Sequence, residues 1–189
     1  MKVTQISNLV SKSDLEIREL SCVPVAEMMT GFALNVIDDH IVFLTGGLYD
    51  WESSNSALAL DLNSGDWLYE STYPRLNTGR YCHSSCTTDS AVFVFGGFHI
   101  GTRALKTIER MSIHHETYSD GSVKTRRWDQ FTMQSSDPLT NCLMATLDNS
   151  SILVLGGING QQKRQSYGFV LDAETLKEKY ELPLSDVPF

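Results

Sequence analysis

An apolar run that ends on two glycines occurs three times in this chain. The runs are VFLTGG at 42–47, VFVFGG at 92–97 and ILVLGG at 152–157, which place glycine pairs at Gly46 and Gly47, Gly96 and Gly97, and Gly156 and Gly157. Successive pairs lie about 50 and about 60 residues apart, a spacing in the range of structural repeats. The chain is therefore predicted to fold as a series of similar units.

Each glycine pair follows a short polar triplet at a constant offset. The triplets are DDH at 38–40, TDS at 88–90 and DNS at 148–150. Alignment on the glycines makes Asp39, Asp89 and Asn149 equivalent. Asp and Asn bend tight turns because they tolerate left-handed backbone and hydrogen-bond to it. Each triplet is therefore predicted to join two strands in a hairpin.

Four strands are predicted in each unit. The second strand runs from the hairpin into the glycines and is apolar at consecutive positions, which indicates that both of its faces are covered. The predicted first strands are 32–36, 81–86 and 141–147; the third strands are 57–62, 106–113 and 167–172; the fourth strands begin at Trp67 and Trp128 and occupy 175–182 in the last unit.

The second unit is longer than the first between its glycines and its tryptophan. The extra residues occupy about 114–126 and contain Asp120-Gly121, a dipeptide typical of a two-residue hairpin turn. We therefore expect the third and fourth strands of this unit to extend into a projecting hairpin.

The composition is that of a globular protein that does not bind nucleic acid. Hydrophobic residues make up 41% and charged residues 20%, and 15 basic against 23 acidic residues give a formal net charge of −8, which repels a phosphate backbone. No apolar run approaches the roughly 18 residues of a membrane span, and no signal core follows Met1. The four cysteines are expected to be reduced, so we expect an intracellular, cytoplasmic location.

No residue pattern predicts a catalytic, metal or cofactor site. Cys82, His83 and Cys86 have the order C-x-H-x-x-C, but side chains alternate along a strand, so His83 is expected to point away from both cysteines. The glycine pairs end strands without the helix that a phosphate-binding loop requires. We therefore expect a non-enzymatic protein without cofactors.

The order of the remaining landmarks resembles the kelch repeat. The double glycine at 46 and 47 is followed by Asp61, Trp67, Pro74 and Arg80 in the order of that family. The resemblance implies an all-β fold, a partial kelch-type β-propeller of about three and a half four-stranded antiparallel blades. Its segments would be a half blade at 1–25, holding a third and a fourth strand, and kelch blades at 26–75, 76–137 and 138–189.

The chain also departs from the family pattern. Arginines that ring the channel in some kelch proteins are represented by Arg80 alone, because Thr30 and Thr140 stand at the aligned positions. The second unit has Ile113 and His114 where an Asp is expected. A partial ring leaves apolar faces open, so we expect either a fragment of a larger propeller or a ring completed by another chain.

The expected function is protein–protein interaction, as a kelch-repeat scaffold or a recruiting subunit. The loops after the glycine pairs and those before the first strands should share one face, where aromatic and basic residues form a candidate binding surface. Its residues are Tyr49, Trp51, Arg75, Arg80, His99, Arg103, Lys163 and Arg164. The projecting hairpin around Asp120, on the opposite face, is the other candidate contact.

The resemblance also implies classes of partner and one alternative function. The partners would be another propeller segment, a cytoskeletal protein or a component of a ubiquitin ligase. The alternative is part of a kelch-like propeller enzyme that acts on carbohydrate, similar to galactose oxidase or to a sialic-acid isomerase.

Overall fold

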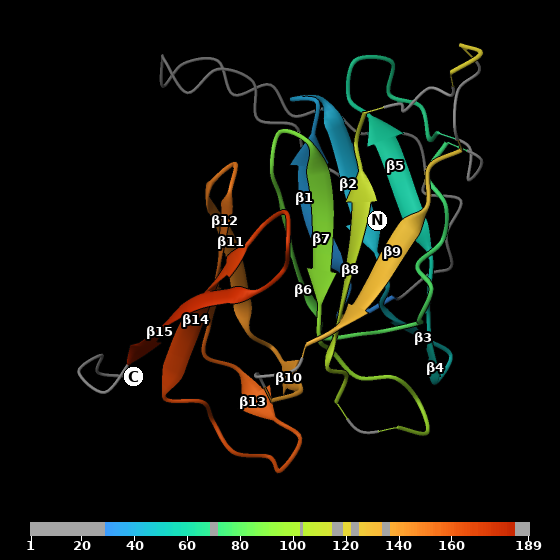
Figure 1. Cartoon of the computed structure of the whole chain (residues 1–189). Helices are drawn as coiled ribbons and strands as arrows, with labels where there is room; N and C mark the ends of the chain where they lie inside the picture. Colours follow the sequence, from blue (N-terminus) through green and yellow to red (C-terminus); the bar gives the residue numbers. More distant parts are fainter. Residues whose placement is uncertain are drawn as a thin grey trace, which may run out of the picture.

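The computed structural model describes residues 29–68, 72–102, 104–114, 119–121, 125–133 and 137–183. Within these ranges the chain is all-β, with five antiparallel sheets of two to four strands. The half blade predicted at 1–25 and the predicted site residue Arg103 lie outside the described residues. Three sheets are large, and they lie next to one another in chain order (Figure 1).

The first sheet has the strand order β1-β2-β5. Its strands are β1 (Ala33–Ile37), β2 (Ile41–Thr45) and β5 (Ala57–Asp61). The turn between β1 and β2 holds Asp39 at a φ of 58°, which confirms the left-handed conformation predicted for it. The predicted fourth strand is represented, within the described ranges, by a single bridge from Trp67 to β5.

The second and third sheets have four strands each, as predicted, and both follow the order of the sequence. The strands of the second sheet are β6 (Ser84–Thr87), β7 (Ala91–Phe95), β8 (Thr107–Ser112) and β9 (Trp128–Thr132). The strands of the third sheet are β11 (Leu143–Asp148), β12 (Ser151–Leu155), β14 (Tyr167–Asp172) and β15 (Glu178–Pro183).

The hairpin turns of these two sheets differ from the prediction. Asp89 and Asn149 do not share the left-handed backbone of Asp39. The Oγ1 of Thr88 instead accepts the N–H of Ala91 over 3.2 Å in the second sheet, and a carboxylate at the end of β11 binds the turn of the third sheet. The two predicted turn residues bond each other, because Asn149 Nδ2 donates to Asp89 Oδ2 over 2.5 Å.

Each glycine pair leads into a short hairpin. These hairpins lie at one end of the molecule, which we call the loop end, opposite the tips of the β1-β2, β6-β7 and β11-β12 hairpins (Figure 1). The short strands are β3 (Leu48–Tyr49), which pairs with β4 (Glu52–Ser53), and β10 (Leu139–Thr140), which pairs with β13 (Ile158–Asn159).

The strand register confirms that Trp67 and Trp128 are equivalent. Each tryptophan pairs with a residue of its sheet's third strand. On its other side, that residue pairs with the valine that stands four places before the glycine pair. In the third sheet this position faces Glu178. A carboxylate therefore replaces the tryptophan, and the nearby aromatic Tyr180 pairs one place further along the strand.

The predicted projecting hairpin does not extend the second sheet within the described residues. The ladder between β8 and β9 ends at the pair Met111 and Trp128. Gly121 has a φ of 82° in a turn, as its dipeptide predicts. At the base of the insertion, Arg126 Nε donates to the carbonyl of Ile113 over 3.0 Å. Among the described residues, a side-chain hydrogen bond and not a strand pair therefore joins the two ends of the insertion.

Apolar side chains fill the two spaces between the large sheets. Between the first and second sheets, the ring of Phe43 lies 5.1 Å from that of Tyr73 and 6.2 Å from that of Trp128. Between the second and third sheets, Phe95 meets Phe169 edge-on at 6.1 Å. All residues of β2 and β7 are buried, which confirms that both faces of these strands are covered.

In the part of the chain that the structure describes, the third sheet is covered on one face only. Leu153 and Leu155 of β12 are half-buried. The register places Leu143 of β11 on their face, and it is 56% exposed. Leu147 and Tyr180 are each 53% exposed beside them. These five residues define the open face of the third sheet, against which no described element packs.

Candidate interaction surface

The first two glycine pairs lie against the segments that precede the second and third sheets. A Cβ on Gly46 would lie 2.4 Å from the carbonyl oxygen of Arg80, and a Cβ on Gly96 would lie 2.1 Å from that of Leu139. Both glycines also have positive φ, 61° and 68°, a conformation that other residues rarely adopt. The close contact between sheets therefore requires glycine at both positions.

The same places carry a repeated hydrogen bond. The N–H of Gly47 donates to the carbonyl of Arg80, and the N–H of Gly97 donates to that of Leu139, both over 2.8 Å. Leu139 therefore occupies the position of Arg80, and the alignment that gave this place to Thr140 is off by one residue. The cause is the β6-β7 hairpin, which is one residue shorter than its two counterparts.

Arg80 lies inside the protein, which corrects its assignment to a binding surface. Its side chain is fully buried, and Nη2 donates to Oε1 of the fully buried Glu109 over 2.5 Å. Nη1 donates to the carbonyl of Gly96 over 3.0 Å. The Glu109 carboxylate also accepts the N–H groups of Asn77 and Thr78 over 2.7 and 3.1 Å. The ion pair and these hydrogen bonds hold the segment that precedes the second sheet against β8.

The charge state of this pair follows from its surroundings. Burial lowers the pKa of the Arg80 guanidinium, and the charge and hydrogen bond of Glu109 oppose that shift. A guanidinium starts from so high a pKa that it stays protonated at neutral pH. The pair is thus ionic and almost completely hydrogen-bonded, the condition under which a buried charge is tolerated.

A second buried polar side chain lies between the first two sheets. His83 is 7% exposed, and its Nε2 lies 3.1 Å from Oγ1 of Thr45. Its Nδ1 has no hydrogen-bond partner in the described part of the chain. Desolvation and, second, the charge of Arg80 lower the pKa of His83 to about 3. The folded protein therefore holds His83 neutral.

We expect the free energy of unfolding to fall as the pH drops below about 6.5. The unfolded chain protonates His83 near the ordinary histidine pKa of about 6.5, whereas the folded chain does so only near about 3. Between these values the unfolded state binds more protons, so stability is lost on acidification, by at most about 1.4 kcal/mol per pH unit. Urea unfolding at pH 7 and pH 5 measures this slope. His83→Gln should show a shallower slope, and equal slopes in both proteins would contradict the expectation.

Exposed aromatic side chains stand at the loop end. Asp50 and Trp51 form the two-residue turn between β3 and β4, with φ values of 45° and 63°. The side chain of Trp51 is 83% exposed, and that of Tyr49 is 45% exposed. Residues other than glycine seldom take positive φ, and an indole is seldom left in solvent. The hairpin thus holds its largest apolar side chain out in water.

Hydrogen bonds fix this hairpin to the loop after the second glycine pair. His99 Nδ1 lies 2.8 Å from Ser53 Oγ and 2.7 Å from the carbonyl oxygen of Gly79. The N–H of Ile100 donates to the same Ser53 Oγ over 3.2 Å. Ile100 is 45% exposed, and with Tyr49 and Trp51 it forms what we call the loop patch. His99 therefore supports the patch from below.

The other predicted surface residues are spread more widely. Lys163 and Arg164 are exposed in the hairpin after the third glycine pair. Arg75 is exposed in the segment between the first and second sheets, next to Pro74, whose carbonyl accepts the Nε1–H of Trp128 over 2.8 Å. Of the predicted residues that the structure describes, only Tyr49 and Trp51 belong to the loop patch, with His99 hydrogen-bonded beneath it.

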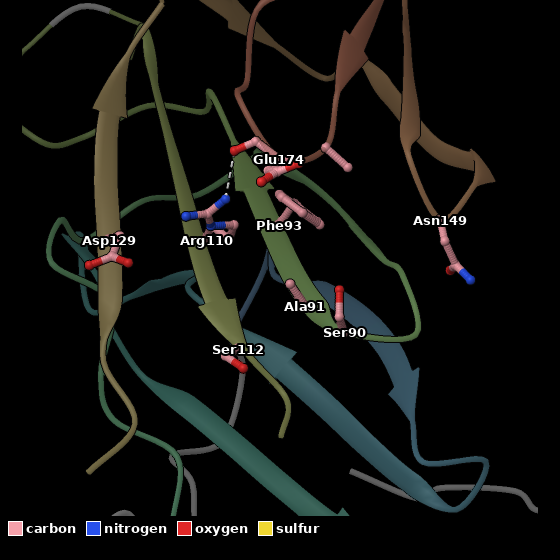
Figure 2. A pocket seen from close by; sticks show the side chains of 9 residues that line it. Ser90, Ala91, Phe93, Arg110, Ser112, Asp129, Asn149 and Glu174 are labelled. Carbon is pink, nitrogen blue, oxygen red and sulfur yellow. Dashed lines mark hydrogen bonds between the residues drawn. The ribbon is translucent and has the colours of Figure 1, made fainter. Parts of the chain in front are cut away.

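A cleft of about 250 Å³ opens between the second and third sheets (Figure 2). Arg110 stands in it, with Nη1 donating to the carbonyl of Glu174 over 2.8 Å and its guanidinium 5.4 Å from the ring centre of Phe131. Asp129, also in the cleft, is paired with Arg127 over 3.2 Å. Both charged side chains already have partners within the protein, so the cleft does not indicate which ligand would bind there.

Among the described residues, no three His, Cys, Asp or Glu side chains gather as metal ligands, and the three cysteines there are free thiols. In the same ranges no helix has the length and apolarity needed to cross a membrane. No model of a known protein family matches the chain, and no curated protein sequence matches it.

Proposed function

We propose that the chain is a non-enzymatic protein-interaction module, built as a partial kelch-type β-propeller in which the three large sheets are blades. The support for this architecture is the recurrence of one contact. Each of the first two sheets ends its second strand on a glycine pair, and each pair donates an N–H to the segment that precedes the next large sheet. Four-stranded antiparallel sheets that repeat in this way and cover each other's apolar faces are the blades of β-propellers.

The observation that carries the proposed function is the exposed Trp51. Burial of an indole against a partner contributes roughly 2–3 kcal/mol, and tryptophan is enriched among residues that dominate binding energy. The turn and the bonds of Ser53 already hold the patch in place, so binding costs little ordering entropy. The net charge of −8 favours a partner that surrounds an apolar pocket with basic residues.

The expected partner is a protein bound at the loop patch, and site-specific cross-linking tests this. A photo-reactive amino acid placed at Ile100 of the full chain should yield one discrete protein adduct in an extract of the source cells. Trp51→Ala should reduce this adduct at least tenfold, because a loss of about 1.4 kcal/mol already weakens binding tenfold and burial of the indole contributes more. Arg80 is left unchanged because its removal would disturb the fold.

The matched control is Phe131→Ala. Phe131 is an aromatic residue that is 38% exposed on β9 and lies outside the loop patch. This variant should leave the adduct at its original level. If Trp51→Ala and Phe131→Ala give equal adduct, the loop patch is not the binding surface.

A further inference from the structure

Backbone hydrogen bonds link the entry points of successive sheets. The N–H of Cys82 donates to the carbonyl of Gly31 over 2.7 Å, and the N–H of Asn141 donates to the carbonyl of Cys82 over 2.9 Å. All three residues have positive φ, between 51° and 65°, so they are equivalent positions. Within the described ranges, no backbone bond uses the N–H of Gly31 or the carbonyl of Asn141. Among the residues that the structure describes, the series therefore ends in an N–H without a backbone acceptor and a carbonyl without a backbone donor.

The glycine pairs end in the same way. Gly47 and Gly97 each donate to the segment that precedes the next large sheet, but the N–H of Gly157 finds no backbone acceptor among the described residues. A Cβ on Gly156 would meet no atom within 4 Å, although its two counterparts are tightly enclosed. At the other end of the series, Met29 holds the position of Arg80, and no described N–H donates to its carbonyl. The glycine pair of the third sheet thus offers an unused N–H donor, and the segment before the first sheet offers the matching carbonyl acceptor.

Apolar side chains accompany these free backbone groups at both ends. Leu143 and Leu147 of β11 are exposed on the open face of the third sheet. On β1, Leu34 and Val36 are 49% and 48% exposed, on the face turned away from the second sheet. The middle of that face is already buried at Val42 and its neighbours. On this face of the first sheet, β1 is therefore the strand that remains exposed and can pack against another copy of β11.

We propose that two copies of this chain associate head to tail, with β11 of each copy packed against β1 of the other. The N–H of Gly157 donates to the carbonyl of the partner's Met29, and the carbonyl of Asn141 accepts from the partner's Gly31. A two-fold axis relates the two contacts, so the two copies close a ring of about six sheets, within the range of β-propellers. This inference rests on the proposed propeller architecture and names a second copy as what completes it.

Sedimentation velocity of the full chain tests the association. The measurement uses about 0.15 M salt, because the net charge of −8 on each copy opposes self-association. The wild-type chain should sediment as a dimer at about 100 μM, which is far above a Kd of about 1 μM. Gly156→Ala should retain the fold and sediment as a monomer, because its new Cβ occupies the space that the partner's backbone needs.

The matched control is Gly101→Ala. Gly101 also has a positive φ, 81°, and a Cβ there also meets nothing within 4 Å, but it lies in a loop outside the proposed contact. This variant carries the same backbone strain and should remain dimeric. A monomeric wild-type chain at about 100 μM overturns the proposal, and so does a dimer that Gly156→Ala leaves intact.

A charge-pair design tests the head-to-tail pairing by a second route. Asn35 Nδ2 donates to Ser85 Oγ over 2.5 Å across the first interface, and the register makes Ala145 and the partner's Leu34 the matching pair. Leu34→Lys alone and Ala145→Glu alone should each give monomers. Both changes in one chain should restore the dimer, and a failure to restore it in folded protein counts against this pairing.

These results and the cross-linking at Ile100 are independent. A monomer that still forms the Trp51-dependent adduct overturns the second copy and leaves the proposed function intact. A dimer without that adduct does the reverse.

Discussion

Replacement of Glu109 by alanine should lower the free energy of unfolding by about 3–5 kcal/mol. The change leaves the guanidinium of Arg80 buried without its counter-ion, and it removes the acceptor of two backbone N–H groups. Urea unfolding followed by circular dichroism measures the loss. The control is Arg127→Ala, which breaks the ion pair with Asp129 that is 83% and 42% exposed. That variant should lose less than about 1 kcal/mol.

A double replacement separates the loss of a charge from the loss of a contact. The positions of Arg80 and Glu109 are held by Met29 and Leu58 in the first sheet. Arg80→Met combined with Glu109→Leu should therefore recover part of the stability that Glu109→Ala loses, since apolar residues can replace a buried ion pair but leave the N–H groups of Asn77 and Thr78 without their acceptor. A double variant as unstable as Glu109→Ala would show that the ion pair is not the source of the loss.

Replacement of Gly96 by alanine should lower the free energy of unfolding by about 2–5 kcal/mol, the sum of left-handed strain and overpacking. The new Cβ would lie 2.1 Å from the carbonyl oxygen of Leu139, so the backbone that leads into the third sheet must move away from the second sheet. Gly101→Ala has comparable backbone strain and open space around the Cβ, and it should lose only about 1–2 kcal/mol. Thermal unfolding of the two variants compares them. Equal losses would mean that sheet contact does not select glycine at position 96.

The elements that local sequence determines were predicted well. The strand predicted at 167–172 coincides with β14. As expected, Trp128 begins the strand that pairs with β8, and Trp67 forms a bridge to β5. Strand periodicity and turn residues act over a few positions, so they can be read without knowledge of the tertiary fold. The left-handed turn of Asp39 belongs to the same class.

The features that depend on a neighbouring sheet were predicted poorly. The sequence pattern places Arg80 on the surface, and this is wrong because Arg80 is buried in an ion pair with Glu109. Glu109 lies on another strand, so residues near Arg80 in the sequence do not reveal the pair. A signal for the pair was present, since the first and third sheets lack both the arginine and the glutamate at the matching positions. The apolar run of β12 resembles those of β2 and β7, yet Leu153 and Leu155 are half-buried. A strand's own residues do not reveal whether another sheet covers it.

The stacking of the large sheets in chain order has a consequence for synthesis of the protein. The core between the first and second sheets draws on no described residue beyond Trp128, so that core can form while the third sheet is still being translated. Domains and repeats commonly fold in the direction of synthesis when their contacts join consecutive segments. The nascent chain can therefore add each sheet to a completed surface as it leaves the ribosome.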